Sequence, residues 1–315
     1  MGTCFWRRQV FEYHPLVGWW HLPNLYARVP LGQTYHRLIT NSAGMRSERE
    51  YPKSRPTGRK RVVFLGDSYT AGDGVSNGDR FTDLLEQRFP HLDALNFGLN
   101  GSGTDQQLLI YEAMAADYEA DAYVLCICIE NIARNLYDCF PSYDWREQQV
   151  AYRPKPYFKL EDGELTLSNS PVPRERRLAE SLDDWRYGFP YIPGDPDPYA
   201  IYNSPDSEHW RIMKAILHRF LAAVKGAPVF LVPMPMYNHY LGEHAPNYMH
   251  RFLELENAAD GVRVVDLLPA MQSVPLERRQ GFRFPDDPHY TAAAHSLVAD
   301  SLEYQFALHA PSLLD

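Results

Sequence analysis

The sequence predicts an α/β protein, a three-layer α/β/α sandwich around a central parallel sheet of about five strands. Two observations lead to this fold class. Short, nearly continuous apolar runs recur after residue 61, as in strands that are buried on both faces of a parallel sheet. Helical stripes of apolar residues lie between most of these runs. Such alternation implies right-handed crossovers, which place helices on both faces of the sheet.

Five apolar runs are the predicted strands, and three stripes are the predicted helices. The strands are expected at residues 62–65, 94–97, 122–129, 229–232 and 262–267. The helices are expected at residues 81–89, 108–114 and 210–224. The last helix is the clearest, because Trp210, Met213 and Leu217 follow the i, i+3, i+7 spacing of one helical face. Asp206 or Ser207 can cap its first turn.

Two segments lie outside this rhythm. Residues 1–60 are interpreted as an N-terminal extension packed on a main domain of residues 61–315. Residues 138–206 are rich in Pro, Tyr, Asp and Arg and are interpreted as an insertion, with a β-hairpin at 157–167 that turns at Asp-Gly. Because the insertion follows the third strand, it is expected at the carboxyl edge of the sheet. There it acts as a lid or shapes the substrate site, or else it is a surface subdomain without a role in the site.

Composition excludes several classes of function. The chain has 315 residues, a net charge of −9 and a pI near 5.7, which argues against non-specific nucleic-acid binding. No apolar run reaches the length of about 18 residues that a membrane-spanning helix needs. The N-terminus lacks an apolar stretch typical of a secretion signal, so a cytoplasmic location is the default expectation.

Cofactors and metals find little support in the motifs. The chain has neither a P-loop nor a G-x-G-x-x-G motif, so no nucleotide cofactor is predicted. Its four cysteines include no C-x-x-C pair, so no metal site is predicted either. Cys126 and Cys128 lie on one predicted strand and are expected to be reduced core residues.

The most informative feature is a serine at the end of the first predicted strand. Residues 62–65 lead directly into Gly66-Asp67-Ser68, which places the Ser68 hydroxyl at the carboxyl edge of the sheet, where open α/β folds have their sites. The tripeptide alone is weak evidence for a catalytic serine, since it is common in plain turns. Asp67 is expected to bond local backbone N–H groups.

A carboxylate and an imidazole near the C-terminus complete the material for a nucleophilic triad. A serine hydroxyl needs an adjacent base, which His289 can supply. Asp286 lies three residues earlier and would orient the imidazole, whereas Asp287 has the wrong spacing for this role and is expected to face solvent. The backbone N–H of Ser68 is a candidate donor to the oxyanion of a tetrahedral intermediate.

These residues resemble the four sequence blocks of the SGNH/GDSL hydrolase superfamily. The matching stretches are GDSYTAGDGV from Gly66, NFGLNG from Asn96, Asn131, and Asp286-x-x-His289. The resemblance covers roughly residues 60–135 and 205–310. It implies a flavodoxin-like fold and a serine esterase without a cofactor.

The resemblance also implies two further oxyanion donors. One is a glycine N–H of the second block, here Gly101, with Gly98 and Gly103 as alternatives. The other is the side-chain amide of Asn131 in the third block, with Asn135 as the alternative; Asn131 could instead cap the next helix.

The third block departs from the family pattern. It reads Ile-Glu-Asn-Ile at residues 129–132, where the family has Gly-x-Asn-Asp. The asparagine is retained, but Glu130 brings a carboxylate beside the expected oxyanion hole. Glu130 either repels an anionic intermediate or points away and pairs with Arg134.

The sequence therefore predicts hydrolysis of a carboxylic ester through an acyl-serine intermediate. The resemblance implies a small-molecule substrate with a short acyl group, such as acetyl, on a saccharide or another polar scaffold. Two alternatives stay open: an acyltransferase that uses the same triad, and a binding module that has lost catalysis. The substrate-binding residues are unknown; a polar group after the fourth strand either lines the cleft or belongs to a surface loop, namely Asn238, His239, Tyr240 and His244.

Overall fold

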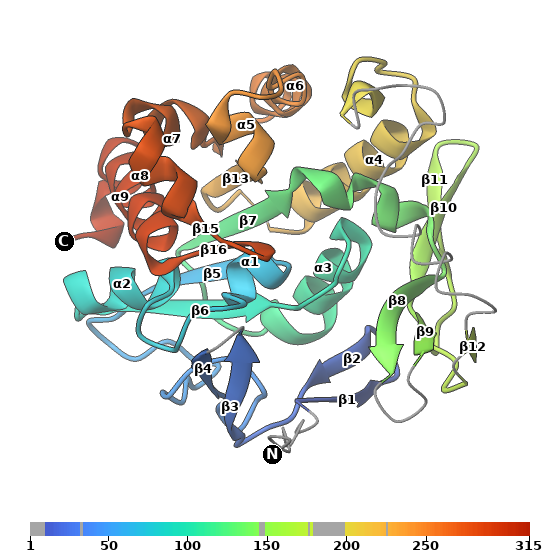
Figure 1. Ribbon diagram of the computed structural model, residues 1–315, viewed down its shortest axis with the longest axis horizontal. Helices are drawn as coiled ribbons and strands as arrows, with labels where there is room; N and C mark the ends of the chain where they lie inside the picture. The colour runs from blue at the N-terminus through green and yellow to red at the C-terminus, as the bar shows by residue number, and fades with distance from the viewer. Residues whose placement is uncertain (1–9, 32–33, 145–148, 176, 179–198, 225) are drawn as a thin grey trace.

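The structure, a computed structural model, has a five-stranded parallel sheet at its centre (Figure 1). It describes residues 10–31, 34–144, 149–175, 177–178, 199–224 and 226–315. The strand order is β14-β13-β7-β5-β6. The five strands are β5 (Lys60–Gly66), β6 (Leu92–Gly98), β7 (Ala122–Cys128), β13 (Val229–Met234) and β14 (Val262–Val264). The five predicted strands are thereby confirmed.

Nine α-helices are described, most of them around this sheet. Their bounds are α1 (Ser68–Ala71), α2 (Phe81–Arg88), α3 (Thr104–Ile110), α4 (Glu208–Ala223), α5 (Tyr237–Leu241), α6 (Met249–Ala258), α7 (Leu268–Ser273), α8 (Leu276–Arg279) and α9 (Ala292–His309). The other helical segments are the π-helix η1 (Tyr111–Ala115) and the 3₁₀-helices η2 (Ile129–Leu136), η4 (Ala200–Tyr202), η5 (Gln280–Phe282) and η6 (Pro311–Leu313). The predicted helix at 108–114 thus begins earlier, as α3, and continues as the π-helix η1. Of the two candidate caps of α4, Ser207 accepts a bond from the backbone N–H of Trp210 at 3.3 Å.

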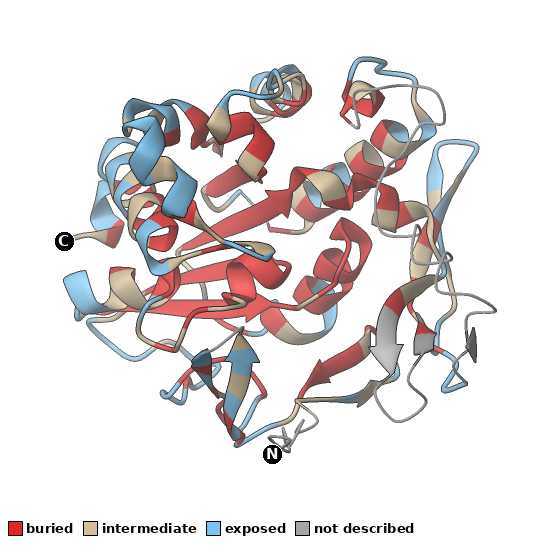
Figure 2. Ribbon diagram, viewed as in Figure 1, coloured by how far each residue is buried: buried red, intermediate tan, exposed pale blue. Residues whose placement is uncertain are grey.

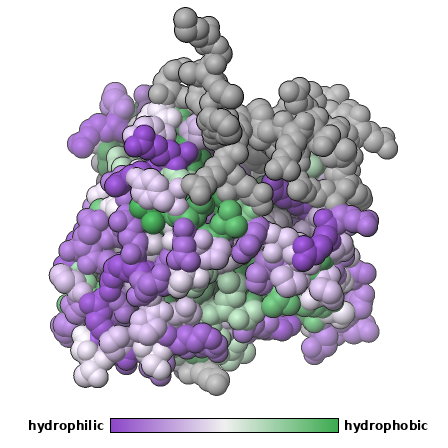
Figure 3. Space-filling model, turned by 90° about the horizontal axis from the view of Figure 1, so that it is seen from below, coloured by the Kyte–Doolittle hydropathy of each residue, from purple (hydrophilic) through white to green (hydrophobic). Residues whose placement is uncertain are grey.

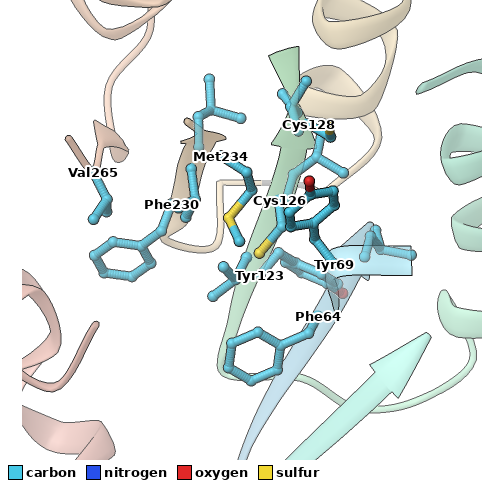
Figure 4. Close-up of a cluster of buried hydrophobic side chains, with 14 of the residues drawn as sticks. Phe64, Tyr69, Tyr123, Cys126, Cys128, Phe230, Met234 and Val265 are labelled. Carbon is cyan, nitrogen blue, oxygen red and sulfur yellow. The ribbon is translucent and has the colours of Figure 1, made fainter. Parts of the chain in front are cut away.

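Side-chain alternation along the strands assigns one face of the sheet. Phe64 of β5 and Phe230 of β13 are both aligned with Val124 of β7, so the three side chains share a face. Phe64 contacts Phe81 of α2, with ring centroids 5.8 Å apart, and Phe230 contacts Phe306 of α9 at 5.0 Å. This face is therefore covered by α2 and α9. Figure 4 shows a cluster of buried side chains that includes Phe64 and Phe230.

The neighbouring residue on β7 belongs to the opposite face. Tyr123 contacts Tyr111 of η1 and Phe220 of α4, with centroid distances of 5.5 and 6.2 Å. Helices therefore cover both faces, and the predicted three-layer sandwich is confirmed. The central strands are almost wholly buried (Figure 2), which explains why the sequence shows continuous rather than alternating apolar runs. Cys126 and Cys128 lie in this core as free thiols, as predicted.

The N-terminal extension contributes two hairpins. They are formed by β1 (Phe11–His14) with β2 (Gly18–His21), and by β3 (Tyr26–Leu31) with β4 (Thr34–Ile39). Trp19 and Trp20 of β2 are buried in the same hydrophobic core as the central sheet. The guanidinium of Arg46, which is 1% exposed, donates to the backbone carbonyls of Ala71 and Gly72 at the C-terminal end of α1. The extension is therefore packed against the loop that follows the GDS motif.

The insertion contains five strands in its described part. They are β8 (Cys139–Asp144), β9 (Gln149–Pro154), β10 (Tyr157–Glu161), β11 (Glu164–Ser168) and β12 (Arg177–Leu178). The predicted hairpin is confirmed: β10 pairs with β11, and Asp162 and Gly163 at its turn have φ angles of 51° and 85°. Two residues with positive φ are typical of a type I′ turn. Residues 179–198, which the lid interpretation includes, lie outside the described residues.

A buried ion pair connects the insertion to the main domain. Lys155, between β9 and β10, and Asp105, in α3, are both fully buried and bonded to each other. The Lys155 ammonium also donates to the carbonyls of Arg134 and Tyr137, at 3.0 and 3.1 Å. The insertion is thereby fixed to α3 and to the end of η2.

Replacing Lys155 with Met is expected to lower the free energy of unfolding by about 3–5 kcal/mol. Loss of the ammonium removes a donor from the buried carboxylate of Asp105 and from three carbonyls, those of Arg134, Tyr137 and Pro156. Chemical denaturation measures the change. Lys159→Met, at an exposed position on β10, is the matched control and should alter stability by less than about 0.5 kcal/mol. Equal stabilities of the two variants would contradict this assignment.

The face seen from below in Figure 1 is mostly hydrophilic, interrupted by apolar patches (Figure 3). Within the described residues, every helix is too short or too polar to cross a membrane.

Candidate active site

The nucleophile candidate lies where β5 turns into α1. Gly66 ends the strand, and a Cβ added there would lie 2.0 Å from the Thr70 hydroxyl, so the turn requires glycine. The Asp67 carboxylate accepts the backbone N–H of Tyr69 at 3.0 Å and caps α1, as predicted for this residue. Ser68 is consequently the first residue of the helix, at the carboxyl edge of the sheet.

His289 reaches Ser68 from the other end of the chain. It lies on β16 (Asp287–Tyr290), which pairs with β15 (Arg283–Phe284). Its Nε2 is 2.8 Å from the Ser68 Oγ, a hydrogen-bond distance. Tyr69 supports this approach, because its hydroxyl donates to the Pro288 carbonyl at 2.9 Å and its ring lies 5.0 Å from the imidazole. Serine and histidine, 221 positions apart in the chain, are therefore brought together as predicted.

The carboxylate that orients His289 is Asp287, and the prediction of Asp286 is wrong. Asp287 Oδ1 is 2.6 Å from the Nδ1 of His289 and also accepts the His289 backbone N–H at 2.8 Å. The physical reason is strand alternation: residues two apart on β16 point to the same side. Asp286 precedes the strand, in an exposed turn.

The charges around the imidazole favour its protonated form. Burial lowers the pKa of His289, but the hydrogen bond that its imidazole donates to Asp287 and the charges of Asp73 and Asp287 outweigh burial, so the pKa lies above the ordinary value of 6.5. For Asp287, burial raises the pKa, but the hydrogen bonds and the charge of His289 lower it by more, so the pKa of Asp287 lies below its ordinary value. Asp287 is thus an anion at neutral pH and stabilises an imidazolium.

A cavity of about 360 Å³ opens over these groups. Ser68 and His289 line it, and so do both predicted oxyanion residues, Gly101 and Asn131. The remaining lining residues are mainly aromatic or charged: Phe11, Trp19, Tyr69, Asp73, Asn100, Cys128, Glu130, Arg134, Phe140, Arg153, Met236 and Pro288.

Of the three candidate glycines, only Gly101 lines the cavity, and its φ of 75° is one that glycine adopts without strain. Gly98 is a packing residue, since a Cβ there would lie 2.3 Å from the Ala71 nitrogen. Gly103 precedes α3, where a Cβ would lie 2.6 Å from the Asp105 carboxylate.

Of the two candidate asparagines, only Asn131 lines the cavity. The Asn131 amide donates to the Asp67 carboxylate and is thereby oriented at the cavity wall. Asn135 accepts the backbone N–H of Asp105 at 3.1 Å and donates to the Thr104 hydroxyl, so it caps α3. The structure therefore brings Ser68, Gly101 and Asn131 together around one cavity.

Residues 64–297 match the sequence model of the GDSL-like Lipase/Acylhydrolase family. The chain belongs to this family. Because the match covers most of the chain and includes Ser68, Asp287 and His289, the protein is a carboxylic ester hydrolase of the GDSL type.

Several solved structures are similar to this GDSL-family chain. A lipase/acylhydrolase from Enterococcus faecalis is 15% identical, with a TM-score of 0.44, over 78% of this chain and 95% of the other. A GDSL-family lipolytic protein from Veillonella parvula is 11% identical, with a TM-score of 0.44, over 79% and 98%. An acetylxylan esterase from Geobacillus stearothermophilus, solved as a catalytic mutant, is 13% identical, with a TM-score of 0.46, over 79% and 95%. The search of curated proteins found no match.

Glu130, the residue that departs from the family pattern, pairs with a tyrosine. The Tyr199 hydroxyl lies 3.0 Å from Glu130 Oε1 and 3.0 Å from Asn238 Oδ1. Arg134 instead lies 3.8 Å from the Asp67 carboxylate. Burial raises the pKa of Glu130, while the bond from Tyr199 lowers it, with a net increase. Tyr199 thus holds Glu130 by a hydrogen bond at the wall of the GDSL-family cavity.

The polar group after β13 is not part of the described cavity lining. Asn238, His239 and Tyr240 of α5 are buried rather than on a surface loop, and His239 contacts the Tyr199 ring at a centroid distance of 4.2 Å. His244, in the loop after α5, also contacts the Tyr199 ring, at a centroid distance of 5.7 Å, and Tyr199 in turn bonds to Glu130 of the cavity lining.

Sequence reasoning missed two kinds of residue in this GDSL site. Asp287 had a detectable signal, the period-two spacing to His289 within a short strand. The wall residues Trp19, Asn100 and Phe140 belong to three separate elements or loops, and nothing in their local sequence indicates that they meet.

Proposed function

We propose that the protein hydrolyses small-molecule carboxylic esters through a covalent acyl-serine at Ser68. The supporting observation is the continuous chain of hydrogen bonds from Ser68 through His289 to Asp287, at 2.8 and 2.6 Å. Both distances are within the range for a nucleophile, its base and the group that orients the base.

In the proposed reaction the imidazole transfers a proton in each of two steps, first from Ser68 and then from water. Ser68 Oγ attacks the ester carbonyl while His289 Nε2 accepts the hydroxyl proton. The C–O bond to the alcohol then breaks, and His289 gives the proton to the departing oxygen. Water attacks the acyl-serine, again with His289 as base, which releases the carboxylic acid and restores the serine hydroxyl. Asp287 keeps Nδ1 protonated throughout and stabilises the imidazolium.

The oxyanion of each tetrahedral intermediate needs donors on the cavity wall. We assign these to the backbone N–H groups of Ser68 and Gly101 and to the side-chain amide of Asn131, which all belong to residues lining the cavity. The bond from Asn131 to Asp67 supports this role, because it holds the amide in one orientation.

For the substrate, we propose a short acyl group, such as acetyl, on a saccharide or another small alcohol. The cavity volume of about 360 Å³ falls within the range of small-molecule sites. An acetyl group fills a minor part of it, which leaves room for part of the alcohol.

A fluorophosphonate probe combined with peptide mapping tests the proposed mechanism. The probe should phosphonylate Ser68 in the folded protein, since it reacts only with an activated serine. Acetyl esters should prevent the labelling and release acetate. A folded protein that stays unlabelled would favour a binding module without catalysis. Acetyl transfer to an added alcohol in preference to water would favour an acyltransferase.

A further inference from the structure

Three aromatic rings form one wall of the cavity above Ser68. Phe11 and Trp19 come from the β1–β2 hairpin, and Phe140 comes from β8. We call these three residues the aromatic wall. Residues 11 and 19 precede the part of the chain that matches the family, which begins at residue 64.

Trp19 is bonded to the residue before Gly101, the proposed oxyanion donor. Its indole Nε1–H donates to the backbone carbonyl of Asn100 at 2.9 Å, and the side chain is buried. His21, two residues further along β2, lies with its Nε2 3.2 Å from Asn100 Oδ1. The hairpin is thus bonded to the residue that directly precedes Gly101.

Phe140 lies against Gly101 itself. A Cβ added at Gly101 would come within 2.9 Å of the Phe140 ring, so the ring occupies the space beside this backbone. The Trp19 ring lies 5.8 Å from Phe140, and the Arg134 guanidinium lies 5.1 Å from the ring centroid. These contacts hold a half-exposed phenyl ring at the mouth of the proposed oxyanion hole.

Trp19 and Phe140 of the aromatic wall therefore lie beside Gly101, to which the proposed function assigns the binding of the ester carbonyl. We propose that this wall binds an aromatic ring carried by the ester, on its acyl or its alcohol side. The inference rests on the proposed function and specifies the class of ester. Aromatic pairs contribute about 0.5–1.5 kcal/mol beyond the burial of area, which is a preference of roughly 2- to 12-fold over a saturated ring of similar size.

Matched substrate pairs measure this preference with little change in intrinsic reactivity: both alcohol-side esters release a primary alcohol, and both acyl-side esters release methanol. Benzyl acetate and cyclohexylmethyl acetate place the ring on the alcohol side. Methyl phenylacetate and methyl cyclohexylacetate place it on the acyl side. The ratio of kcat/KM within each pair reports ring recognition, because both members undergo the same chemistry.

The decisive variant is Phe140→Leu, which keeps an apolar side chain but removes the ring. It should lower the aromatic-to-saturated ratio about 3- to 10-fold in one of the two pairs, and that pair identifies the side of the ester that carries the ring. Phe140→Tyr retains the ring and should retain the ratio. Tyr26→Leu, at a 54% exposed position on β3, is the control for loss of an aromatic residue outside the cavity lining. Unchanged ratios in both pairs for Phe140→Leu would overturn the inference.

Binding to the Ser68→Ala protein separates this inference from the proposed function. Calorimetric titration with benzyl acetate and cyclohexylmethyl acetate, and with the acyl-side pair, gives the same ratios without turnover. A preference for the aromatic member that Phe140→Leu removes supports the aromatic wall even if the wild-type protein hydrolyses neither ester. Hydrolysis of all four esters without such a preference overturns the wall and leaves the acyl-serine mechanism intact.

Discussion

Ser68→Ala is expected to lower kcat for acetyl-ester hydrolysis by a factor of about 10⁴–10⁶. The described hydrogen bond of the Ser68 hydroxyl is the one to His289, so its removal eliminates the nucleophile and leaves only binding and oxyanion stabilisation. Steady-state kinetics on a chromogenic acetyl ester measures the loss. The free energy of unfolding should change by less than about 0.5 kcal/mol, because a single hydroxyl at the cavity contributes little to packing.

Ser102→Ala is the matched control for this prediction. Ser102 is also buried near the end of β5, where its hydroxyl donates to the Gly66 carbonyl at 3.3 Å, but it does not line the described cavity. Its replacement should leave turnover within a few-fold of the wild type. Comparable losses in the two variants, or turnover near the wild-type level in Ser68→Ala, would remove the case for Ser68 as the nucleophile.

Asp287→Asn is expected to lower kcat by about 10⁴, whereas Asp286→Asn should stay close to the wild type. An asparagine amide can donate to Nδ1, which favours the tautomer whose Nε2 carries the proton and cannot accept one from Ser68. Asp286 lies in an exposed turn and changes the charge by the same amount. Kinetics of the two variants on one ester decide between the neighbouring carboxylates; a larger loss in Asp286→Asn would restore the original prediction from sequence.

The same two variants, Asp287→Asn and Asp286→Asn, are expected to differ in the pH dependence of kcat/KM. Turnover requires neutral His289, so kcat/KM should fall as the pH decreases through the pKa of His289, which lies above 6.5. Burial lowers this pKa, and the Asp287 bond and charge raise it. Asp287→Asn removes the raising contribution and should move the acid limb to lower pH, while Asp286→Asn leaves it in place. An acid limb that does not move in Asp287→Asn would show that the limb reports a different group.

The central fold could be predicted because its physics is local. A parallel strand buried on both faces needs a continuous apolar run, so β5, β7 and β13 were located from a few residues each. The GDS motif then fixed Ser68, since a strand that ends at Gly66 leaves little choice for the next two positions.

The misassigned acid shows where local reasoning failed. The prediction placed the orienting acid three residues before the imidazole, at Asp286, but β16 is a strand and its alternation selects Asp287. The cavity wall could not be predicted at all, because contacts such as Trp19 with Asn100 join residues 81 positions apart and depend on how the β1–β2 hairpin docks on the loop after β6. The pairing of Glu130 with Tyr199 has the same origin.

The hairpin that carries Trp19 separates two properties along the sequence. The reactive atoms of Ser68, Asp287 and His289 all lie in the span shared with the family, whereas part of the surface facing them comes from residues 11–21. Evolution or engineering could therefore exchange this short β-ribbon and alter which esters are accepted, while the hydrolytic machinery is inherited unchanged. Under the proposed role of the aromatic wall, substrate choice is a modular trait, carried by a segment that performs no bond-breaking step.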